Sequence, residues 1–342
     1  MLQELDSLPA GLLETDSHQL AERLGAPTLI HLPGTREPAL FVSVLLHGNE
    51  TVGWEAVRSL LRERLERFGA LRLPRALSLF IGNVSAAASR VRRLPGQPDY
   101  NRVWPGSQEP ETLEHRLMRQ VVDIMARRGI FASLDLHNNT GLNPHYACVN
   151  RLDARFLRLA SLFSRTVVYF IRPTGVQSMA MAEFAPSVTL ECGKVGEQAG
   201  IDHAHEFVAA VLHLSEIPDH PLPARAIDLF HTVAQIRIPE TVSFSFDPRD
   251  VDLWLDPELE RMNFRELPAG TCFARVCAGV KARLDVIDEF GRDVSARYFR
   301  LDGAEWRLRR CLMPSMLTRD ETVIRQDCLG YLMERYSIQS QI

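Results

Sequence analysis

The stretch Ala39-Leu40-Phe41-Val42-Ser43-Val44-Leu45-Leu46-His47-Gly48-Asn49-Glu50 joins a mostly apolar run to a histidine and a glutamate. An apolar run of this length predicts a strand buried within a sheet. The polar residues after it indicate a turn into a helix, so the imidazole of His47 and the carboxylate of Glu50 are directed to one point. We interpret this pair as two ligands of a metal site.

A second apolar run, Phe131-Ala132-Ser133-Leu134-Asp135-Leu136, stops at His137. In open α/β sheets, ligands bind outside the carboxyl ends of the strands, so we expect His137 to join His47 and Glu50. Two histidines and one glutamate leave the fourth position of a zinc ion open for water. Each histidine alone would more often be an ordinary polar residue at a strand end. Together they predict one Zn2+ per chain at His47, Glu50 and His137.

The β-rich run Ser187-Val188-Thr189-Leu190-Glu191-Cys192-Gly193 carries an acidic residue where its alternation predicts an apolar or small one. A carboxylate near the end of a buried strand is costly unless it is paired or functional. Glu191 is therefore a candidate catalytic base that takes the proton of a metal-bound water. The alternative is an ion pair with a nearby arginine.

The segment from Arg92 to Gly106 is rich in proline and glycine and contains Arg92, Arg93 and the pair Asn101-Arg102. Such loops lie on the surface. A guanidinium there can hold a substrate carboxylate by two hydrogen bonds or stabilise a developing oxyanion. Taken alone, a solvated basic loop is the simpler interpretation.

The four motifs, in this order, resemble the succinylglutamate desuccinylase and aspartoacylase family of the zinc carboxypeptidase clan over roughly residues 25 to 215. The resemblance implies that His47, Glu50 and His137 bind zinc and that Glu191 activates water. It also implies that Arg92 polarises the scissile carbonyl, and Arg93 is the alternative candidate for this role. Asn101 and Arg102 are similar to the pair that holds a substrate carboxylate.

Two segments bear on the substrate. Family members that act on acetylated aspartate carry an arginine before the catalytic glutamate, where this chain reads Gln177-Ser178-Met179-Ala180-Met181-Ala182-Glu183-Phe184. This Met-rich stretch offers no charge for a second carboxylate, although Arg172 lies slightly upstream. Acetylaspartate is therefore not the first expectation. Lys194, after the base, is closer to the desuccinylase pattern.

Two further residues are candidates for the substrate pocket. Lys194 is one of two lysines in the chain, with Lys281, and its alternative is a solvent-facing loop position. His145, in Asn143-Pro144-His145-Tyr146, either lines the pocket or caps the next strand.

The expected activity is that of a zinc-dependent hydrolase that cleaves the amide bond of a small N-acyl amino acid. A zinc carboxypeptidase acting on short peptides would share the zinc site and the carboxylate clamp. A metal-binding protein without catalysis would need no catalytic base at Glu191.

The cluster Asp202-His203-Ala204-His205-Glu206 contains several potential ligands but predicts a helix that is N-capped by Asp202 and runs to Leu214. His203 and His205 are two positions apart, so they cannot face the same side of a helix. We expect no second metal site there.

The composition is typical of a cytoplasmic enzyme. The formal net charge of -4 and the absence of a basic stripe argue against nucleic acid as a partner. No segment approaches the roughly 18 consecutive apolar residues of a membrane helix, and the N-terminus lacks the regions of a signal peptide. The six cysteines form no Cys-x-x-Cys pair. A small carboxylate-bearing acylated substrate is the expected partner, and homo-oligomerisation is left open.

The 342 residues suffice for a large α/β domain and a smaller second one. Over residues 1–216, strands alternate with helices, which predicts a three-layer α/β catalytic domain with a mostly parallel or mixed sheet, of zinc carboxypeptidase type. The expected strands are 28–31, 39–46, 76–83, 131–136, 146–150, 166–171 and 187–192. The expected helices are 50–67, 110–128, 153–164 and 202–214.

Three prolines in residues 217–223 indicate a linker. Beyond it, short runs at 234–238, 241–246, 272–276, 282–286, 298–301 and 322–329 predict a β-rich domain over residues 224–342. The resemblance implies that this domain covers the active-site mouth and can lend a tyrosine, for which Tyr298, Tyr331 and Tyr336 are the candidates.

Overall fold

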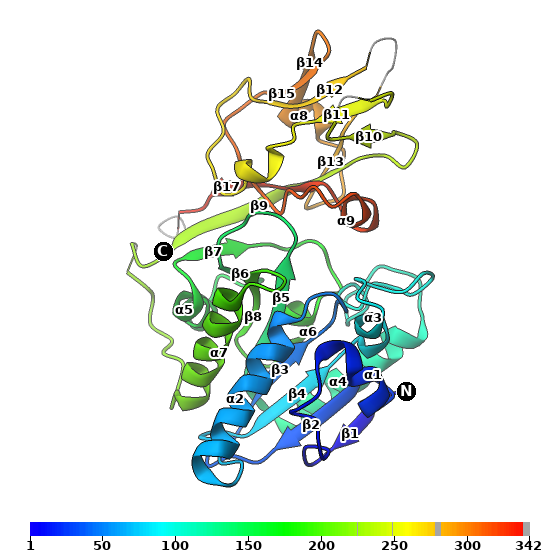
Figure 1. Ribbon diagram of the computed structural model, residues 1–342. Helices are drawn as coiled ribbons and strands as arrows, with labels where there is room; N and C mark the ends of the chain where they lie inside the picture. The colour runs from blue at the N-terminus through cyan, green and yellow to red at the C-terminus, as the bar shows by residue number, and fades with distance from the viewer. Residues whose placement is uncertain (224, 248, 278–281, 338–342) are drawn as a thin grey trace. The chain divides into compact units, whose positions relative to one another are not determined.

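The computed structural model describes residues 1–223, 225–247, 249–277 and 282–337. The chain divides into two compact units, and Figure 1 labels the helices and strands of both. The N-terminal unit comprises Met1–Asn138, His145–Tyr169 and Pro173–Asp228, and the C-terminal unit comprises Asn139–Pro144, Phe170–Arg172 and Leu229–Ile342.

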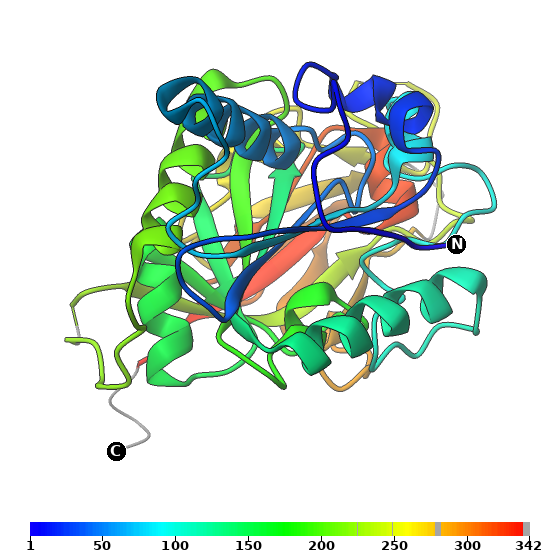
Figure 2. The same ribbon diagram turned by 90° about the horizontal axis from the view of Figure 1, so that it is seen from below.

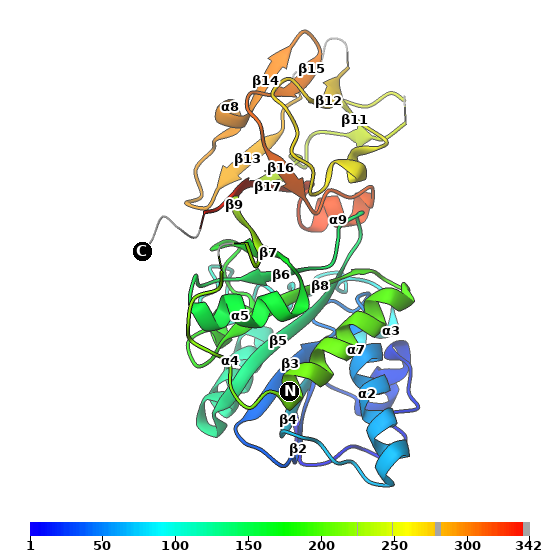
Figure 3. The same ribbon diagram turned by 90° about the vertical axis from the view of Figure 1, so that its left-hand side faces the viewer.

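The N-terminal unit is built on a mixed sheet with the strand order β1-β2-β4-β3-β5-β8-β6-β7. Its strands are β1 (Gln3–Leu5), β2 (Thr28–Leu32), β3 (Ala39–Val44), β4 (Leu77–Ile81), β5 (Ile130–Asn139), β6 (Tyr146–Val149), β7 (Thr166–Tyr169) and β8 (Ser187–Lys194). Strand β3 runs parallel to both β4 and β5, whereas β6 is antiparallel to β8. Figure 3 shows β3, β5 and β8 in the middle of the unit. The predicted α/β class with a mixed sheet is confirmed.

The middle strands are mostly apolar because helices cover both faces of the sheet. Every residue of β3 and of β4 is buried. Figure 2 shows α2 (Val52–Phe68) and α7 (Gln198–His213) on one side of the sheet, and α4 (Leu113–Arg128) and α6 (Gln177–Met181) on the other. The remaining helices are η1 (Ser17–Gln19), α1 (Leu20–Leu24), α3 (Val84–Ala88) and α5 (Ala154–Phe163).

The C-terminal unit is rich in β-structure. Strands β16, β17, β9 and β13 form one group, and β10-β11-β12-β15-β14 form a second sheet. Buried side chains from both groups, such as Ile236, Phe273 and Leu332, share one core. The element bounds are β9 (Asp228–Arg237), β10 (Phe244–Ser245), β11 (Leu253–Leu255), η2 (Leu259–Met262), β12 (Cys272–Val276), β13 (Asp285–Asp288), α8 (Ser295–Tyr298), β14 (Phe299–Asp302), β15 (Glu305–Leu308), β16 (Met313–Ser315), α9 (Glu321–Gln326) and β17 (Gly330–Arg335).

Several predicted elements differ from the structure, and three of the differences are as follows. Helix α7 begins at Gln198 and not after Asp202, whose carboxylate accepts a hydrogen bond from Gln198 Nε2 within the helix. Residues 322–329 were expected as a strand because of their β-branched side chains, but most of them form α9. The carboxylate of Asp320 caps this helix by accepting from the first backbone N–H groups, which outweighs the β propensity. Strand β5 continues to Asn139, so His137 lies within the strand.

No helix in the described part of the chain is both long and apolar enough to cross a bilayer.

Arg75 joins the end of α7 to the sheet. Its Nη2 donates to the carbonyl of Leu214 at 2.9 Å and its Nη1 to that of Pro38 at 2.8 Å, while the guanidinium lies 3.6 Å from the ring centroid of Phe131. Arg75 is buried, and Arg75→Met would remove both hydrogen bonds and the stacking on Phe131, which should lower the free energy of unfolding by about 2 kcal/mol. Urea unfolding measures the loss. Arg119→Met, which removes an exposed ion pair, should have little effect, and equal effects would contradict this role.

Candidate metal centre and active site

The turn after β3 is shaped by close packing against α3. Leu45 has a φ of 55°, and a Cβ on Gly48 would lie 2.3 Å from the backbone of Ala86. Only glycine fits this approach. The turn carries His47 and Glu50 from the end of β3 to the start of α2, as the sequence predicts.

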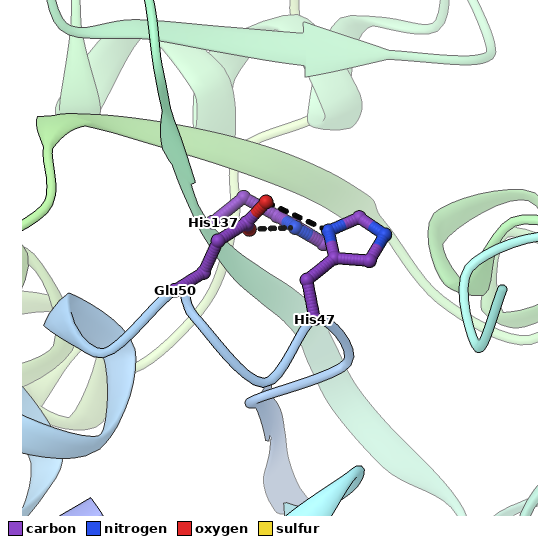
Figure 4. Close-up of side chains that lie close together, drawn as sticks. All are labelled: His47, Glu50 and His137. Atoms are coloured by element: carbon purple, nitrogen blue, oxygen red, sulfur yellow. Dashed lines mark hydrogen bonds and ion pairs between the residues drawn. The ribbon is translucent and has the colours of Figure 1, made fainter. Parts of the chain in front are cut away.

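The three predicted ligands meet at one point. His47 Nδ1 lies 2.8 Å from Glu50 Oε1, and His137 Nδ1 lies 2.7 Å from Glu50 Oε2. Figure 4 shows both imidazoles turned toward the carboxylate, with His137 contributed by β5. All three side chains are buried, and one ligand atom from each lies within 4.8 Å of the others.

Two further carboxylates contact the Nε2 atoms of the two imidazoles, on the side of each ring away from Glu50. His47 Nε2 lies 2.9 Å from Asp99 Oδ1, and His137 Nε2 lies 2.8 Å from Asp135 Oδ2. A carboxylate on one ring nitrogen fixes the ring and leaves the other nitrogen for a metal. Asp99 and Asp135 were not identified from the sequence. Asp135 could have been, because it lies two residues before His137 and so on the same face of the strand.

The donor set fits zinc. Two imidazole nitrogens and one carboxylate oxygen are the ligands of many catalytic zinc sites. Bonds of about 2.1 Å in a tetrahedral arrangement need ligand atoms roughly 3.4 Å apart. The separations of 2.8 and 2.7 Å therefore need to widen only slightly.

Glu191 is a buried carboxyl close enough to the ligands to interact with their charges. It lies on β8 opposite Tyr146 of β6. Among the described residues, its Oε2 has no hydrogen-bond partner. Burial raises the pKa of Glu191 to about 7, against the opposing attraction of His137. A carboxyl with a pKa near neutrality is suited to proton transfer at physiological pH.

The two arginines that precede Asp99 are placed differently. Arg92 donates to Asp99 Oδ2 from Nε at 3.2 Å and from Nη2 at 2.8 Å, and its Nη1 lies 3.6 Å from Glu50 Oε1. Arg93 Nη1 donates to the carbonyl of Gln97 in its own loop. Arg92 is therefore next to the ligand set.

Asn101 belongs to the hydrogen-bond network behind His137. Its Nδ2 lies 3.1 Å from His137 Nε2 and 3.3 Å from Asp135 Oδ2, and its Oδ1 accepts from the backbone N–H of Gln177 at 2.9 Å. Arg102 Nη1 donates to the carbonyl of Asn101. Whether Asn101 and Arg102 hold a substrate carboxylate stays a prediction.

His145 and Lys194 lie near the junction of β8 and α7. The His145 ring stacks on His203, with centroids 4.9 Å apart. A Cβ on Gly193 would lie 2.9 Å from His145 Nε2. Lys194 is the last residue of β8, and its backbone N–H donates to Glu197. Their roles in the substrate pocket stay predictions.

The candidate tyrosines and Arg172 belong to the C-terminal unit. Tyr298 is buried in the core of that unit. Tyr331 Oη accepts from Gln235 Nε2, and the Tyr336 ring lies against His231. The contribution of any one of them to the site stays a prediction.

The carboxylate behind His137 gives a test of the metal centre. Asp135→Asn should weaken zinc binding roughly 10-fold or more, because loss of the negative charge makes His137 a poorer donor. Competition with a zinc chelator measures the affinity. Asp153→Asn makes the same chemical change at the N-cap of α5 and should leave zinc affinity unchanged. Equal affinities in wild type and Asp135→Asn would contradict the role of Asp135.

The sequence was compared with those of known protein families. The model of the succinylglutamate desuccinylase/aspartoacylase catalytic domain matches residues 36–217. No curated protein matches the chain.

Solved structures share the fold. The succinylglutamate desuccinylase from Chromobacterium violaceum is 19% identical, with a TM-score of 0.55 over 88% of this chain and 86% of that one. The succinylglutamate desuccinylase/aspartoacylase from Rhodobacter sphaeroides is 15% identical, with a TM-score of 0.55 over 90% and 88%. Murine aminoacylase 3 is 17% identical, with a TM-score of 0.54 over 88% and 97%. At these identities the likeness concerns the fold alone.

Proposed function

The chain belongs to the succinylglutamate desuccinylase/aspartoacylase family, and from this membership we propose that it is a zinc-dependent hydrolase that cleaves the amide bond of a small N-acyl amino acid. The observation that carries the proposal is the meeting of His47, Glu50 and His137 beside the buried carboxyl of Glu191. The related desuccinylases and aminoacylase act, by their names, on acylated amino acids.

Each residue has a distinct task in this reaction. His47, Glu50 and His137 would hold zinc, which would supply the positive charge that lowers the pKa of water to about 7. Glu191 takes a proton from the attacking water and returns it to the leaving amine, so that an acid and an amine are released. Arg92 stabilises the negative charge that develops on the carbonyl oxygen, which is worth about 3 to 4 kcal/mol for a well-placed donor.

The substrate is held through its carboxylate by Asn101 and Arg102, with His145 and Lys194 lining the pocket. Helix α6 carries no charged residue, so a second carboxylate has no partner there. In this proposal, residues 1–216 are the catalytic domain, and residues 224–342 are a β-rich domain that restricts the substrate to small molecules. The enzyme works in the cytoplasm.

Parallel assays of the zinc-loaded protein test the proposal. N-succinylglutamate, other N-acyl amino acids and short peptides should be compared at equal concentrations. We expect amine release from an N-acyl amino acid at least about 10-fold faster than cleavage of any peptide. Faster peptide cleavage would indicate a carboxypeptidase. Inactivity on a broad amide and ester panel, despite bound zinc, would indicate a metal-binding protein without catalysis.

A further inference from the structure

Asn138 connects the elements that carry the ligands and the base. It follows His137 on β5 and is 3% exposed. Its backbone N–H donates to Glu50 Oε2 at 3.1 Å. Because successive side chains of a strand point to opposite faces, its amide lies on the other side of β5 from the His137 ring.

The oxygen of this amide fixes the start of α2. Asn138 Oδ1 accepts from the backbone N–H of Val52, the first residue of the helix, at 3.0 Å. The first N–H groups of a helix have no partner within the helix. Thr51, at the N-cap, makes no side-chain capping bond, so Asn138 supplies from another strand the acceptor that the cap lacks. The start of α2 follows Glu50 directly, so this bond also holds the ligand in place.

The nitrogen of the same amide fixes the end of β8. Asn138 Nδ2 donates to the carbonyl of Gly193 at 2.9 Å. Gly193 lies two residues after Glu191 and has a φ of 80°, which favours glycine. The bond therefore holds the strand end that carries the base.

The orientation of the amide follows from its partners. The oxygen faces an N–H donor at Val52 and the nitrogen faces a carbonyl acceptor at Gly193. Turning the amide over would place donor against donor and acceptor against acceptor. Asn138 thus satisfies both neighbours in only one arrangement, which sets the spacing between α2 and β8.

We propose that Asn138 is a positioning residue that fixes Glu191 and the Glu50 carboxylate at the spacing that the hydrolysis requires. The catalytic half of this inference rests on the proposed function, whereas the half that concerns Glu50 does not. Loss of the bond to Gly193 releases Glu191 and lowers kcat. Loss of the bond to Val52 loosens Glu50 and weakens metal binding.

Two substitutions separate these effects. Asn138→Asp keeps the acceptor for Val52 but replaces the donor to Gly193. Asn138→Leu keeps the approximate shape and removes both side-chain bonds. The matched controls are Asn263→Asp and Asn263→Leu, because the buried amide of Asn263 also joins a backbone N–H and a carbonyl, both from Leu317 of the C-terminal unit.

The readouts are zinc affinity by chelator competition, and kcat and KM on the best N-acyl substrate. We expect Asn138→Leu to bind zinc about 10-fold more weakly, and both Asn138 variants to lose 10- to 100-fold in kcat with KM changed less than about 3-fold. The Asn263 variants should match wild type in all three quantities.

The role of Asn138 at Glu50 and its role at Glu191 can be disproved separately. Wild-type zinc affinity in a folded Asn138→Leu protein would overturn the role at Glu50 even if no substrate were found. Wild-type kcat in Asn138→Asp would overturn the role at Glu191. If Asn138→Leu does not fold, kcat of Asn138→Asp decides the role at Glu191, and zinc affinity of Asn138→Ala, which also removes both side-chain bonds, decides the role at Glu50. Inactivity of the wild type would count against the proposed function, while the zinc measurements would still judge Asn138.

Discussion

Glu191→Gln should bind about one zinc ion per chain and lose hydrolysis by roughly 10³-fold or more in kcat. The amide occupies the same buried space as the carboxyl but cannot accept a proton from water. Glu191 is not among the three residues whose atoms converge on the metal position, so the substitution should spare zinc. Elemental analysis and steady-state kinetics on one preparation measure both quantities.

Glu55→Gln is the matched control. Burial also raises the pKa of Glu55, but this residue binds Arg58 on α2 and takes no part in the metal centre. Glu55→Gln should therefore hydrolyse substrate at the wild-type rate. A Glu191→Gln enzyme that retains more than about one tenth of wild-type activity would remove Glu191 from the mechanism.

The pH dependence of kcat should reflect the ionisation of the Glu191 carboxyl. Burial raises the pKa of Glu191 to about 7, and a cation bound nearby would lower it again. A base acts when it is deprotonated, so kcat should rise with pH through the pKa of Glu191 and level off above it. The rising limb should lie below about pH 7 in wild type and disappear from the residual activity of Glu191→Gln. An unchanged limb would assign it to another group.

The three residues of the candidate metal centre were predictable because the pattern that reveals each of them lies within a few neighbouring residues. The apolar runs that become β3 and β5 lead to His47 and His137, and the run that becomes β8 contains Glu191; all three are buried. Burial makes such residues costly, so their presence in a sheet core indicates a function. The pattern of short β-like runs also predicted β12 with the bounds that the structure shows.

Unlike the contact of Asp135 with His137, the other supporting contacts were not predictable, because they join distant parts of the chain. Asp99 lies 52 positions from His47, and Asn138 lies 86 positions from Val52. In the sequence, Asp99 is one acidic residue within a basic loop. Only the tertiary structure brings Asp99 to the His47 imidazole and Asn138 to the start of α2, so outer partners that lie far away in the sequence cannot be found without it.

His47→Ala, Glu50→Ala and His137→Ala should each reduce bound zinc from about one ion per chain to below about a tenth, because two protein ligands hold zinc far more weakly than three. His203→Ala is the control, since its ring stacks on His145 and is not among the ligands. A ligand that binds only the folded state stabilises it by about 2.7 kcal/mol at 100 times its Kd. Removing zinc by a chelator should therefore lower the midpoint of urea unfolding in wild type and in His203→Ala, and leave it unchanged in the three ligand variants. A wild-type protein that takes up no zinc on reconstitution would contradict the metal centre itself, and with it the zinc-dependent hydrolysis.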